Sequence, residues 1–228
     1  QDKSKAMVFN RAIKHDFSPE LCLTPGSRLE VVEEMKLVGY QLRSDLRTIT
    51  NTEYIIKRAW KRMWVVRRLK TLGASEQELL SVLRAQVLSV LQFATPAWST
   101  LMTEKESAQI ESVLKTGLYL VYGKKYESFS WALRQAKMSS LSEQRRKMFY
   151  NFTKGCIKSD KFKKWFATSE VPTGSVTRSK QTRFKPIPFR TQAFARSAIP
   201  QMVKIANSPE FEASRITIVQ KSGHVIEV

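Results

Sequence analysis

The chain has 228 residues, with 39 Lys+Arg against 20 Asp+Glu, so its formal net charge is +19. Apolar residues make up 42% of the chain, which is enough for a hydrophobic core and excludes wholesale disorder. Cys22 and Cys156 are too few for a disulfide scaffold or a paired-cysteine zinc site, so we expect a reducing, intracellular location, either nuclear or cytoplasmic.

The excess of positive charge favours a polyanionic partner, such as nucleic acid, an acidic protein or an anionic membrane surface. We expect no membrane span, because Arg84, Gln86 and Gln92 interrupt the longest near-apolar stretch, residues 82–94. The first residue is Gln1 rather than Met, and an apolar run follows at residues 6–9. We interpret the sequence as a fragment or a processed piece.

Residues 1–45 are predicted to form a small antiparallel sheet. Short apolar runs alternate with turn residues, and Thr24-Pro25-Gly26-Ser27 indicates a turn between two strands. Two or three strands need a further layer over their apolar face, so this region is not expected to be stable alone.

Residues 46–167 are predicted to be helical. Two capping boxes, Ser75 with Glu78 and Thr103 with Glu106, predict the starts of two helices, of which the first should be the buried centre of a bundle. Shorter helices are predicted over residues 129–138 and 142–157. The helix that precedes Ser75 is expected to be capped by Asn51 or Thr52 and to end at Gly73.

That preceding helix has seven basic residues and no acidic one between Lys57 and Leu72. At about 100° per residue, five of them share one side, namely Lys57, Arg58, Lys61, Arg62 and Arg68. The other side is apolar and contains Trp60 and Trp64, which we interpret, together with Trp98, as core residues. Such a row of cations suits successive phosphates, and an ordinary solvated face is the alternative.

The rest of the chain is also basic. Arg145 and Arg146 lie near the start of the predicted helix over 142–157, where the helix dipole disfavours cations, so either a bound phosphate or simple solvation is expected there. Residues 168–228 read as a basic linker or tail compatible with a terminal hairpin. Basic residues interleaved with aromatic ones suit single-stranded nucleic acid, and a disordered tail is the alternative.

Catalytic equipment is sparse. The only histidines are His15 and His224, and the four aspartates, Asp2, Asp16, Asp45 and Asp160, are scattered. Two-metal phosphoryl transfer needs carboxylates that lie close together, so we predict no metal site in this chain. The sequence therefore indicates a binding piece rather than a complete catalyst.

Seven segments that follow one another along the chain carry a family resemblance. They are Lys3-Ser4-Lys5-Ala6-Met7-Val8-Phe9, Leu29-Glu30-Val31-Val32-Glu33-Glu34-Met35-Lys36-Leu37-Val38-Gly39-Tyr40, Ala59-Trp60-Lys61-Arg62-Met63, Arg67-Arg68-Leu69, Val87-Leu88-Ser89-Val90-Leu91-Gln92-Phe93-Ala94-Thr95-Pro96-Ala97-Trp98, Leu141-Ser142-Glu143-Gln144-Arg145-Arg146 and Pro186-Ile187-Pro188. In this order they resemble the region downstream of the catalytic motif in non-LTR (LINE-like) retrotransposon reverse transcriptases, over most of residues 1–200.

This resemblance implies an α+β, mainly α fold. Residues 1–45 would be an antiparallel remnant of the polymerase palm, residues 46–167 a helical thumb-like bundle, and residues 168–228 a basic, partly irregular tail. Lys3 would take the place of the motif-D lysine, which in related polymerases is thought to help protonate the leaving pyrophosphate. Leu37-Val38-Gly39-Tyr40 would be the primer-grip hairpin, with a bulge or strand bend at Gly39 as the alternative.

The sequence also departs from this family. Ser4 replaces the usual threonine, Leu37 replaces the usual aromatic residue, and the Ala-Asp-Asp motif is absent, so no catalysis is expected from this chain alone. We expect no cofactor on this chain, Mg²⁺ in the full-length polymerase, and an RNA template with a DNA primer as partners. The alternatives are a freestanding basic helical RNA-binding protein and a decayed retroelement copy with no present activity.

Overall fold

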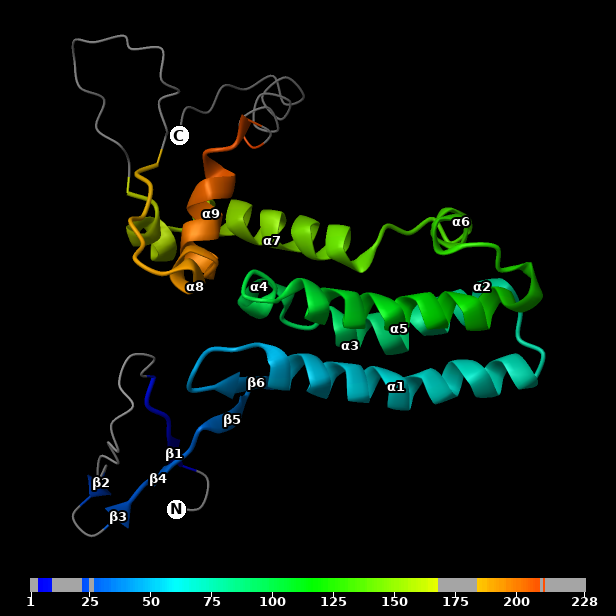
Figure 1. Ribbon diagram of the computed structural model, residues 1–228, viewed down its shortest axis with the longest axis horizontal. Coiled ribbons are helices and arrows are strands. Elements are labelled where there is room, and N and C mark those ends of the chain that lie inside the picture. The colour runs from blue at the N-terminus through cyan, green and yellow to red at the C-terminus, as the bar shows by residue number, and fades with distance from the viewer. Residues whose placement is uncertain (1–3, 10–21, 25–26, 168–183, 210, 212–228) are drawn as a thin grey trace. The chain divides into compact units, whose positions relative to one another are not determined.

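A computed structural model describes residues 4–9, 22–24, 27–167, 184–209 and 211 of the chain (Figure 1). Helices predominate and the strands are short, so the fold is α+β and mainly α, as predicted. Contacts divide the chain into two compact units. Unit 1 comprises residues 1–94 and 102–143, and unit 2 comprises residues 95–101 and 144–228. The functional ranges 1–45, 46–167 and 168–228 stay a prediction.

The strands form three separate pairs rather than the single antiparallel sheet that the sequence led us to expect. β2 (Cys22–Thr24) with β3 (Ser27–Arg28), and β5 (Glu34–Leu37) with β6 (Tyr40–Arg43), are antiparallel. β1 (Lys5–Ala6) and β4 (Glu30–Val31) pair in parallel, which corrects the prediction. The two strands expected beside the Pro25-Gly26 turn pair as β2 and β3, while Pro25 and Gly26 lie outside the described residues.

Three long helical segments build the core of unit 1. The helices of this unit are α1 (Ile49–Thr71), α2 (Glu76–Val82), the π-helical η1 (Leu83–Leu88), α3 (Ser89–Leu91), α5 (Glu104–Tyr122), the 3-10 helix η2 (Gly123–Lys125) and α6 (Phe129–Gln135). α1 and α5 lie side by side and run in the same direction (Figure 1). Two hydrogen bonds join their corresponding ends. The Thr48 hydroxyl, just before α1, donates to Glu106 at the start of α5, and Lys70 near the end of α1 donates to the Leu120 carbonyl near the end of α5.

Close helix contact explains which side chains are buried. At Gly117 on α5, an added Cβ would lie 2.7 Å from Leu83 Cδ1 and 3.3 Å from Met63 Cε, so glycine allows the three helices to approach. Leu83, Val87 and Met63 are fully buried there. The prediction that the segment after Ser75 is a buried helix is confirmed, although its middle is π-helical.

The predicted helix ends are mostly confirmed. Both capping boxes form, at Ser75 and at Thr103, and Gly73 follows α1 with a φ of 84° that glycine adopts without steric cost. The predicted caps Asn51 and Thr52 are wrong, because α1 begins earlier, at Ile49. Both residues lie within α1, and both are buried.

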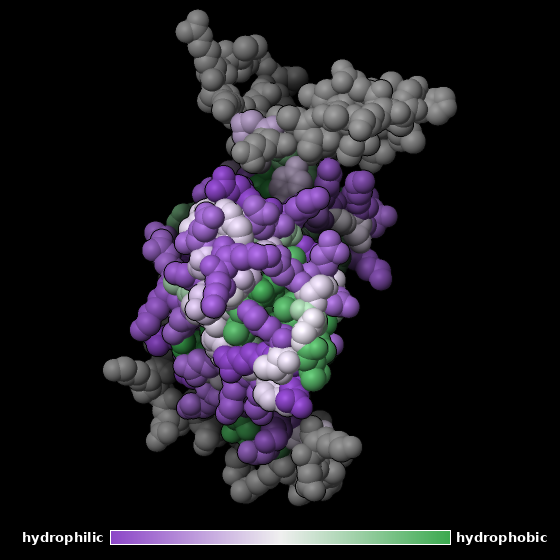
Figure 2. Space-filling view, turned by 90° about the vertical axis from the view of Figure 1, so that its right-hand side faces the viewer, coloured by the Kyte–Doolittle hydropathy of each residue, from purple (hydrophilic) through white to green (hydrophobic). Residues whose placement is uncertain are grey.

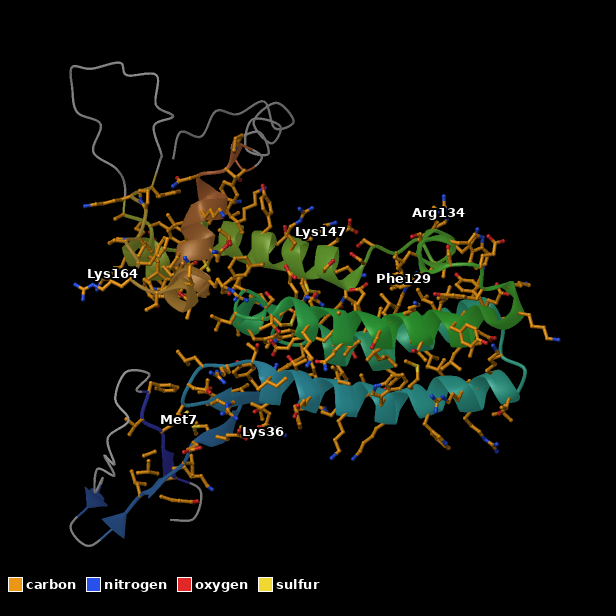
Figure 3. All side chains as sticks on the ribbon, in the orientation of Figure 1. Met7, Lys36, Phe129, Arg134, Lys147 and Lys164 are labelled. Atoms are coloured by element: carbon orange, nitrogen blue, oxygen red, sulfur yellow. The ribbon has the colours of Figure 1, made fainter. Side chains whose placement is uncertain are left out.

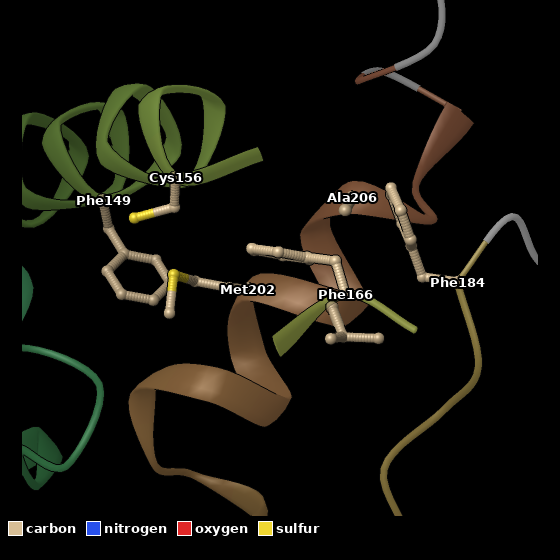
Figure 4. Close-up of a cluster of buried hydrophobic side chains, with 7 residues drawn as sticks. Phe149, Cys156, Phe166, Phe184, Met202 and Ala206 are labelled. Carbon is tan, nitrogen blue, oxygen red and sulfur yellow. The ribbon is translucent and has the colours of Figure 1, made fainter. Parts of the chain in front are cut away.

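Unit 2 has its own hydrophobic core. Its helices are α4 (Thr95–Trp98), most of α7 (Leu141–Lys158), the 3-10 helix η3 (Asp160–Trp165), α8 (Gln192–Ala195) and α9 (Ala198–Ala206). Phe149 and Cys156 on α7 lie against Met202 on α9, and Phe166 packs edge-on against Phe184 (Figure 4). Residues 168–228 were predicted to be a partly irregular tail, and within them α8 and α9 are helical, while the proposed terminal hairpin lies outside the described residues.

Among the described residues, one segment is long and apolar enough to cross a membrane by length and composition, namely Glu76–Trp98. The core helix of a globular domain passes the same test. Leu83, Val87 and Leu91 in this segment are at most 1% exposed, and 39% of its apolar window is buried within the structure. The expectation that the chain has no membrane span stays a prediction.

Candidate nucleic-acid interface

α1 has one buried stripe and one exposed basic side. Ile55, Ala59, Met63 and Val66 follow one another at spacings of three and four residues and are all at most 3% exposed. The opposite positions are exposed, and they carry Lys57, Trp60, Lys61, Trp64, Arg67 and Arg68. These six residues are called here the basic face of α1. Figure 3 shows long nitrogen-tipped side chains that project from α1 on the side away from α5.

The four cations of the basic face have no counterion. Within the described residues, Lys57, Lys61, Arg67 and Arg68 make neither a side-chain hydrogen bond nor a salt bridge. Lys57, Lys61 and Arg68 are four and seven positions apart and therefore form a row along α1, and Arg67 is exposed beside this row. Such a row attracts a polyanion, because bound phosphates release the counterions that otherwise surround them.

Three other basic residues of α1 are engaged within the fold, which corrects the predicted cationic row. Arg62 donates to the Gln86 carbonyl at 3.1 Å, and Lys70 donates to the Leu120 carbonyl. The guanidinium of Arg58 lies over the ring of Tyr54, 5.4 Å from its centroid. Arg58 and Arg62 are therefore only half-exposed, while Arg67, which the prediction left out, is exposed.

Two of the three tryptophans that we interpreted as core residues lie on the surface. Trp64 is 63% exposed and Trp60 is 36% exposed, whereas Trp98 is fully buried as predicted. Sequence alone misplaced the first two because apolar character was equated with burial. The buried stripe of α1 instead uses the small Ala59 and the flexible Met63, whose Cε lies where α5 comes close at Gly117.

A shallow groove of about 670 Å³ runs between α1 and α5. Lys57, Trp60 and Lys61 of the basic face line it, together with Glu53 and Ile56 of α1 and with Gln109 and Ser112 of α5. Its walls therefore combine an aromatic ring, an aliphatic side chain, two cations, one carboxylate and two neutral polar side chains. Figure 2, which views the protein from the end where α1 finishes and α2 begins, shows mostly hydrophilic side chains with small apolar patches between them.

The predicted primer-grip residues form a tight hairpin. Leu37 and Tyr40 face each other across β5 and β6, and Val38 and Gly39 are the two turn residues, with φ of 48° and 87°. Val38 is 86% exposed although it is β-branched and has a positive φ, a strained conformation that tends to occur at functional sites. Gly39 is thus in a turn and not in a bulge.

Gly39 also lies against the ring of Phe93, so its replacement by alanine has two costs. An added Cβ would approach Phe93 Cε1 to 3.1 Å, and the positive φ adds strain. We expect Gly39→Ala to lower the free energy of unfolding by about 1–2 kcal/mol. Gly73→Ala is the matched control, because Gly73 has a similar φ of 84° with open space around it. Urea titrations in which both variants lose equal stability would contradict the Phe93 contact.

The hairpin is fastened to α1 by polar contacts. Asn51, once expected to be a cap, instead accepts a hydrogen bond from the Gln41 backbone N–H at 3.2 Å. Lys36 of β5 lies over the same Tyr54 ring that Arg58 contacts, and a hydrogen bond from Lys36 and the charge of Arg58 lower the pKa of Tyr54. The predicted primer grip and the basic helix thus belong to one packed unit.

A buried carboxylate, Glu106, ties the start of α1 to the start of α5. Glu106 is 4% exposed and accepts hydrogen bonds from the Thr48 hydroxyl at 2.7 Å, the Thr103 hydroxyl at 2.6 Å and the Thr52 hydroxyl at 3.3 Å. Burial by itself raises the pKa of Glu106, but the hydrogen bonds from Thr103, Thr48 and Thr52 outweigh it and lower the pKa below its ordinary value. Thr48 bonds Glu106 and does not cap its own helix.

Arg145 and Arg146, which were predicted together as phosphate ligands, differ in their exposure. Arg145 is only 5% exposed, so it is not a surface phosphate ligand, whereas Arg146 is exposed. Sequence reasoning missed a row further along α7, formed by Lys147 (Figure 3), Lys154 and Lys158 at spacings of seven and four residues. Its signal was the absence of any acidic residue between 144 and 159.

We expect the α7 lysines to contribute to polyanion binding. Changing Lys147, Lys154 and Lys158 together to glutamine should weaken binding of the full chain to an RNA–DNA heteroduplex by roughly tenfold and reduce the salt dependence by about two to three phosphate contacts. Fluorescence anisotropy at several salt concentrations measures both effects. A control variant that loses Lys115, Lys124 and Lys137, which are exposed in unit 1, should retain more affinity. If both variants lost the same amount of affinity, the loss would reflect net charge alone and would contradict a role for the α7 lysines.

Lys3 lies outside the described residues, so its predicted motif-D role stays a prediction. Among the residues that are described, no group of three or more His, Cys, Asp and Glu side chains could hold a metal ion. The Mg²⁺ expected for a full-length polymerase therefore has no donor set in this part of the chain. No family model, curated protein or solved structure matches the sequence.

Proposed function

We propose that this chain is the template–primer-binding part of a retroelement RNA-directed DNA polymerase. The single observation that supports this most is the basic face of α1. It presents four exposed cations that have no counterion among the described residues, on a helix that is firmly packed against α5. Phosphate contacts carry no sequence information, and a polymerase has to move along any sequence. A sequence-independent row of cations meets that requirement.

The position of the hairpin supports the same proposal. In the proposed polymerase, Leu37-Val38-Gly39-Tyr40 would approach the primer end and α1 would follow the phosphates of the RNA–DNA heteroduplex. The strained, exposed turn at Val38 and Gly39 is held on the helical unit by the contact of Gly39 with Phe93 and by the hydrogen bond from Gln41 to Asn51. Nucleotidyl transfer itself would depend on aspartates that this sequence does not contain.

The reading frame upstream of the Gln1 codon tests the polymerase assignment independently of any binding assay. We expect translation of the transcript in that frame to give an Ala-Asp-Asp motif shortly before Gln1. A stop codon or an initiator Met close to Gln1 would overturn the proposal and leave a freestanding basic RNA-binding protein or a retroelement relic.

A further inference from the structure

Two exposed indoles stand within the cationic row of α1, and phosphate binding alone gives them no role. Trp60 and Trp64 are one helical turn apart, and Lys57, Lys61, Arg67 and Arg68 surround them on the same face. Leaving two tryptophans in water is unfavourable, because each loses the apolar burial that most tryptophans gain on folding. Aromatic rings between cations are typical of surfaces that bind single-stranded nucleic acid, where the rings stack on bases and the cations contact the backbone phosphates.

We propose that the basic face of α1, with the groove beside it, binds an unpaired segment of nucleic acid and that Trp60 and Trp64 stack on its bases. This inference rests on the proposed function and assigns a substrate form to the same surface. In a polymerase, such a segment would be a single-stranded stretch of template or primer that adjoins the heteroduplex. The cations would contact the phosphates of paired and unpaired strands alike, and the two indoles would add affinity only for an unpaired strand.

The spacing of the two indoles favours an unpaired strand over a duplex. Residues four apart on an α-helix are separated by about 6 Å along its axis. Neighbouring bases in a duplex lie only about 3.4 Å apart and cover each other's faces, so two indoles at this spacing cannot stack on consecutive paired bases. A single strand whose bases are drawn apart can offer one base to each ring.

The groove between α1 and α5 supplies the remaining contacts. Trp60 forms part of its wall, and the hydroxyl of Ser112 and the amide of Gln109 lie on the opposite side, from α5. These groups can hydrogen-bond a base edge, which an unpaired base leaves open. Lys57 and Lys61 line the same groove and place positive charge where the sugar–phosphate backbone would pass.

Tryptophan variants of the full chain test this inference. We expect Trp60→Ala and Trp64→Ala each to weaken binding of oligouridylate by about tenfold, because stacking of one base contributes on the order of that factor. Binding of a blunt RNA–DNA heteroduplex should change by less than about twofold in the same variants. Trp60→Phe and Trp64→Phe keep an aromatic face and should recover most of the oligouridylate affinity.

Two further measurements separate stacking from indirect effects. Oligouridylate should quench the emission of the wild-type chain more than that of the Trp60→Phe/Trp64→Phe double variant, since the buried Trp98 and the half-exposed Trp131 and Trp165 are the same in both. Leu72→Ala removes another exposed apolar side chain at the end of α1 and should leave both affinities unchanged. Thermal melts by circular dichroism identify any variant that has lost its fold.

The outcomes distinguish this inference from the proposed function. If the alanine variants bind oligouridylate as the wild type does, or lose heteroduplex affinity equally, the stacking inference is overturned while nucleic-acid binding stands. If the wild type binds neither probe at low salt, the proposed function itself fails.

Discussion

Replacing Lys57, Lys61, Arg67 and Arg68 together by glutamine is expected to lower heteroduplex affinity by on the order of a hundredfold at moderate salt. These four cations lie exposed on one side of α1 and have no counterion among the described residues, so their charge is available to phosphates. Each lost contact should also reduce the slope of log affinity against log salt by about 0.9. Fluorescence anisotropy over a range of salt concentrations measures both quantities.

A matched variant tests whether position or only net charge matters. Lys115, Lys124, Arg134 and Lys137 are exposed residues of unit 1 outside α1, and their change to glutamine removes the same four charges. We expect this control to lose several-fold less affinity than the α1 variant, because distant exposed charges are screened beyond about 10 Å at ordinary salt. Equal losses would mean that the basic face of α1 is not the interface.

The largest effect on stability is expected at Glu106. Its two oxygens accept four hydrogen bonds, from the hydroxyls of Thr48, Thr52 and Thr103 and from the Thr103 backbone N–H at 2.8 Å. In Glu106→Gln, an NH₂ group replaces one of these oxygens and cannot accept. Because the site is buried at the start of two helices, we expect a loss of about 2–3 kcal/mol in the free energy of unfolding, measured by urea titration.

The effect of Glu106 should depend on pH in a defined direction. The folded-state pKa of Glu106 is lowered, so its carboxylate contributes its full stabilisation above the unfolded-state pKa of about 4.3. The difference in stability between wild type and Glu106→Gln should therefore be largest near neutral pH and shrink as the pH falls through the folded-state pKa. Glu104→Gln, an exposed change in the same helical turn, should cost only a few tenths of a kcal/mol. A pH-independent difference would contradict the ionised state of Glu106.

Local signals in the sequence predicted much of unit 1. Capping boxes at Ser75 and Thr103 and the glycine at position 73 fix helix ends through short-range hydrogen bonds and backbone conformation, so they are readable without the fold. The hairpin over Leu37-Val38-Gly39-Tyr40 was expected from the family resemblance and not from a local signal, and in the structure Gly39 supplies a positive φ between its two short strands. Structural features were predicted correctly where the contacts that determine them join residues close in sequence.

Features that depend on distant contacts could not be predicted. Thr48 bonds a residue 58 positions away, so nothing near α1 reveals that the helix starts before Asn51. Arg58 and Arg62 have the spacing of surface cations, and only Tyr54 and the Gln86 carbonyl remove them from the exposed row. Trp60 and Trp64 were predicted to be core residues because they are apolar, and the sequence does not indicate that they lie on the exposed side of α1.

A helix of unit 2 also depends on contacts between residues distant in sequence, and it was not predicted. The mixture of basic and aromatic residues up to Arg196 indicates irregular structure, yet α9 follows it closely, with Pro200 in its first turn, where a missing backbone N–H costs nothing. The helix is stabilised by Met202, Val203 and Ala206 packing on residues of α7 and on Phe184, contacts that span tens of residues along the chain. Tertiary burial thus overrides the local composition.

Salt-dependent binding of a blunt RNA–DNA heteroduplex by the unmodified chain tests the central claim most directly. With four unpaired cations on α1 and further lysines on α7, we expect clear binding at low salt and a log–log slope equivalent to at least about four phosphate contacts. The same titration with an uncharged peptide–nucleic-acid duplex should show little binding. Undetectable heteroduplex binding at low salt, or a slope near zero, would contradict the assignment of this chain as a template–primer-binding piece.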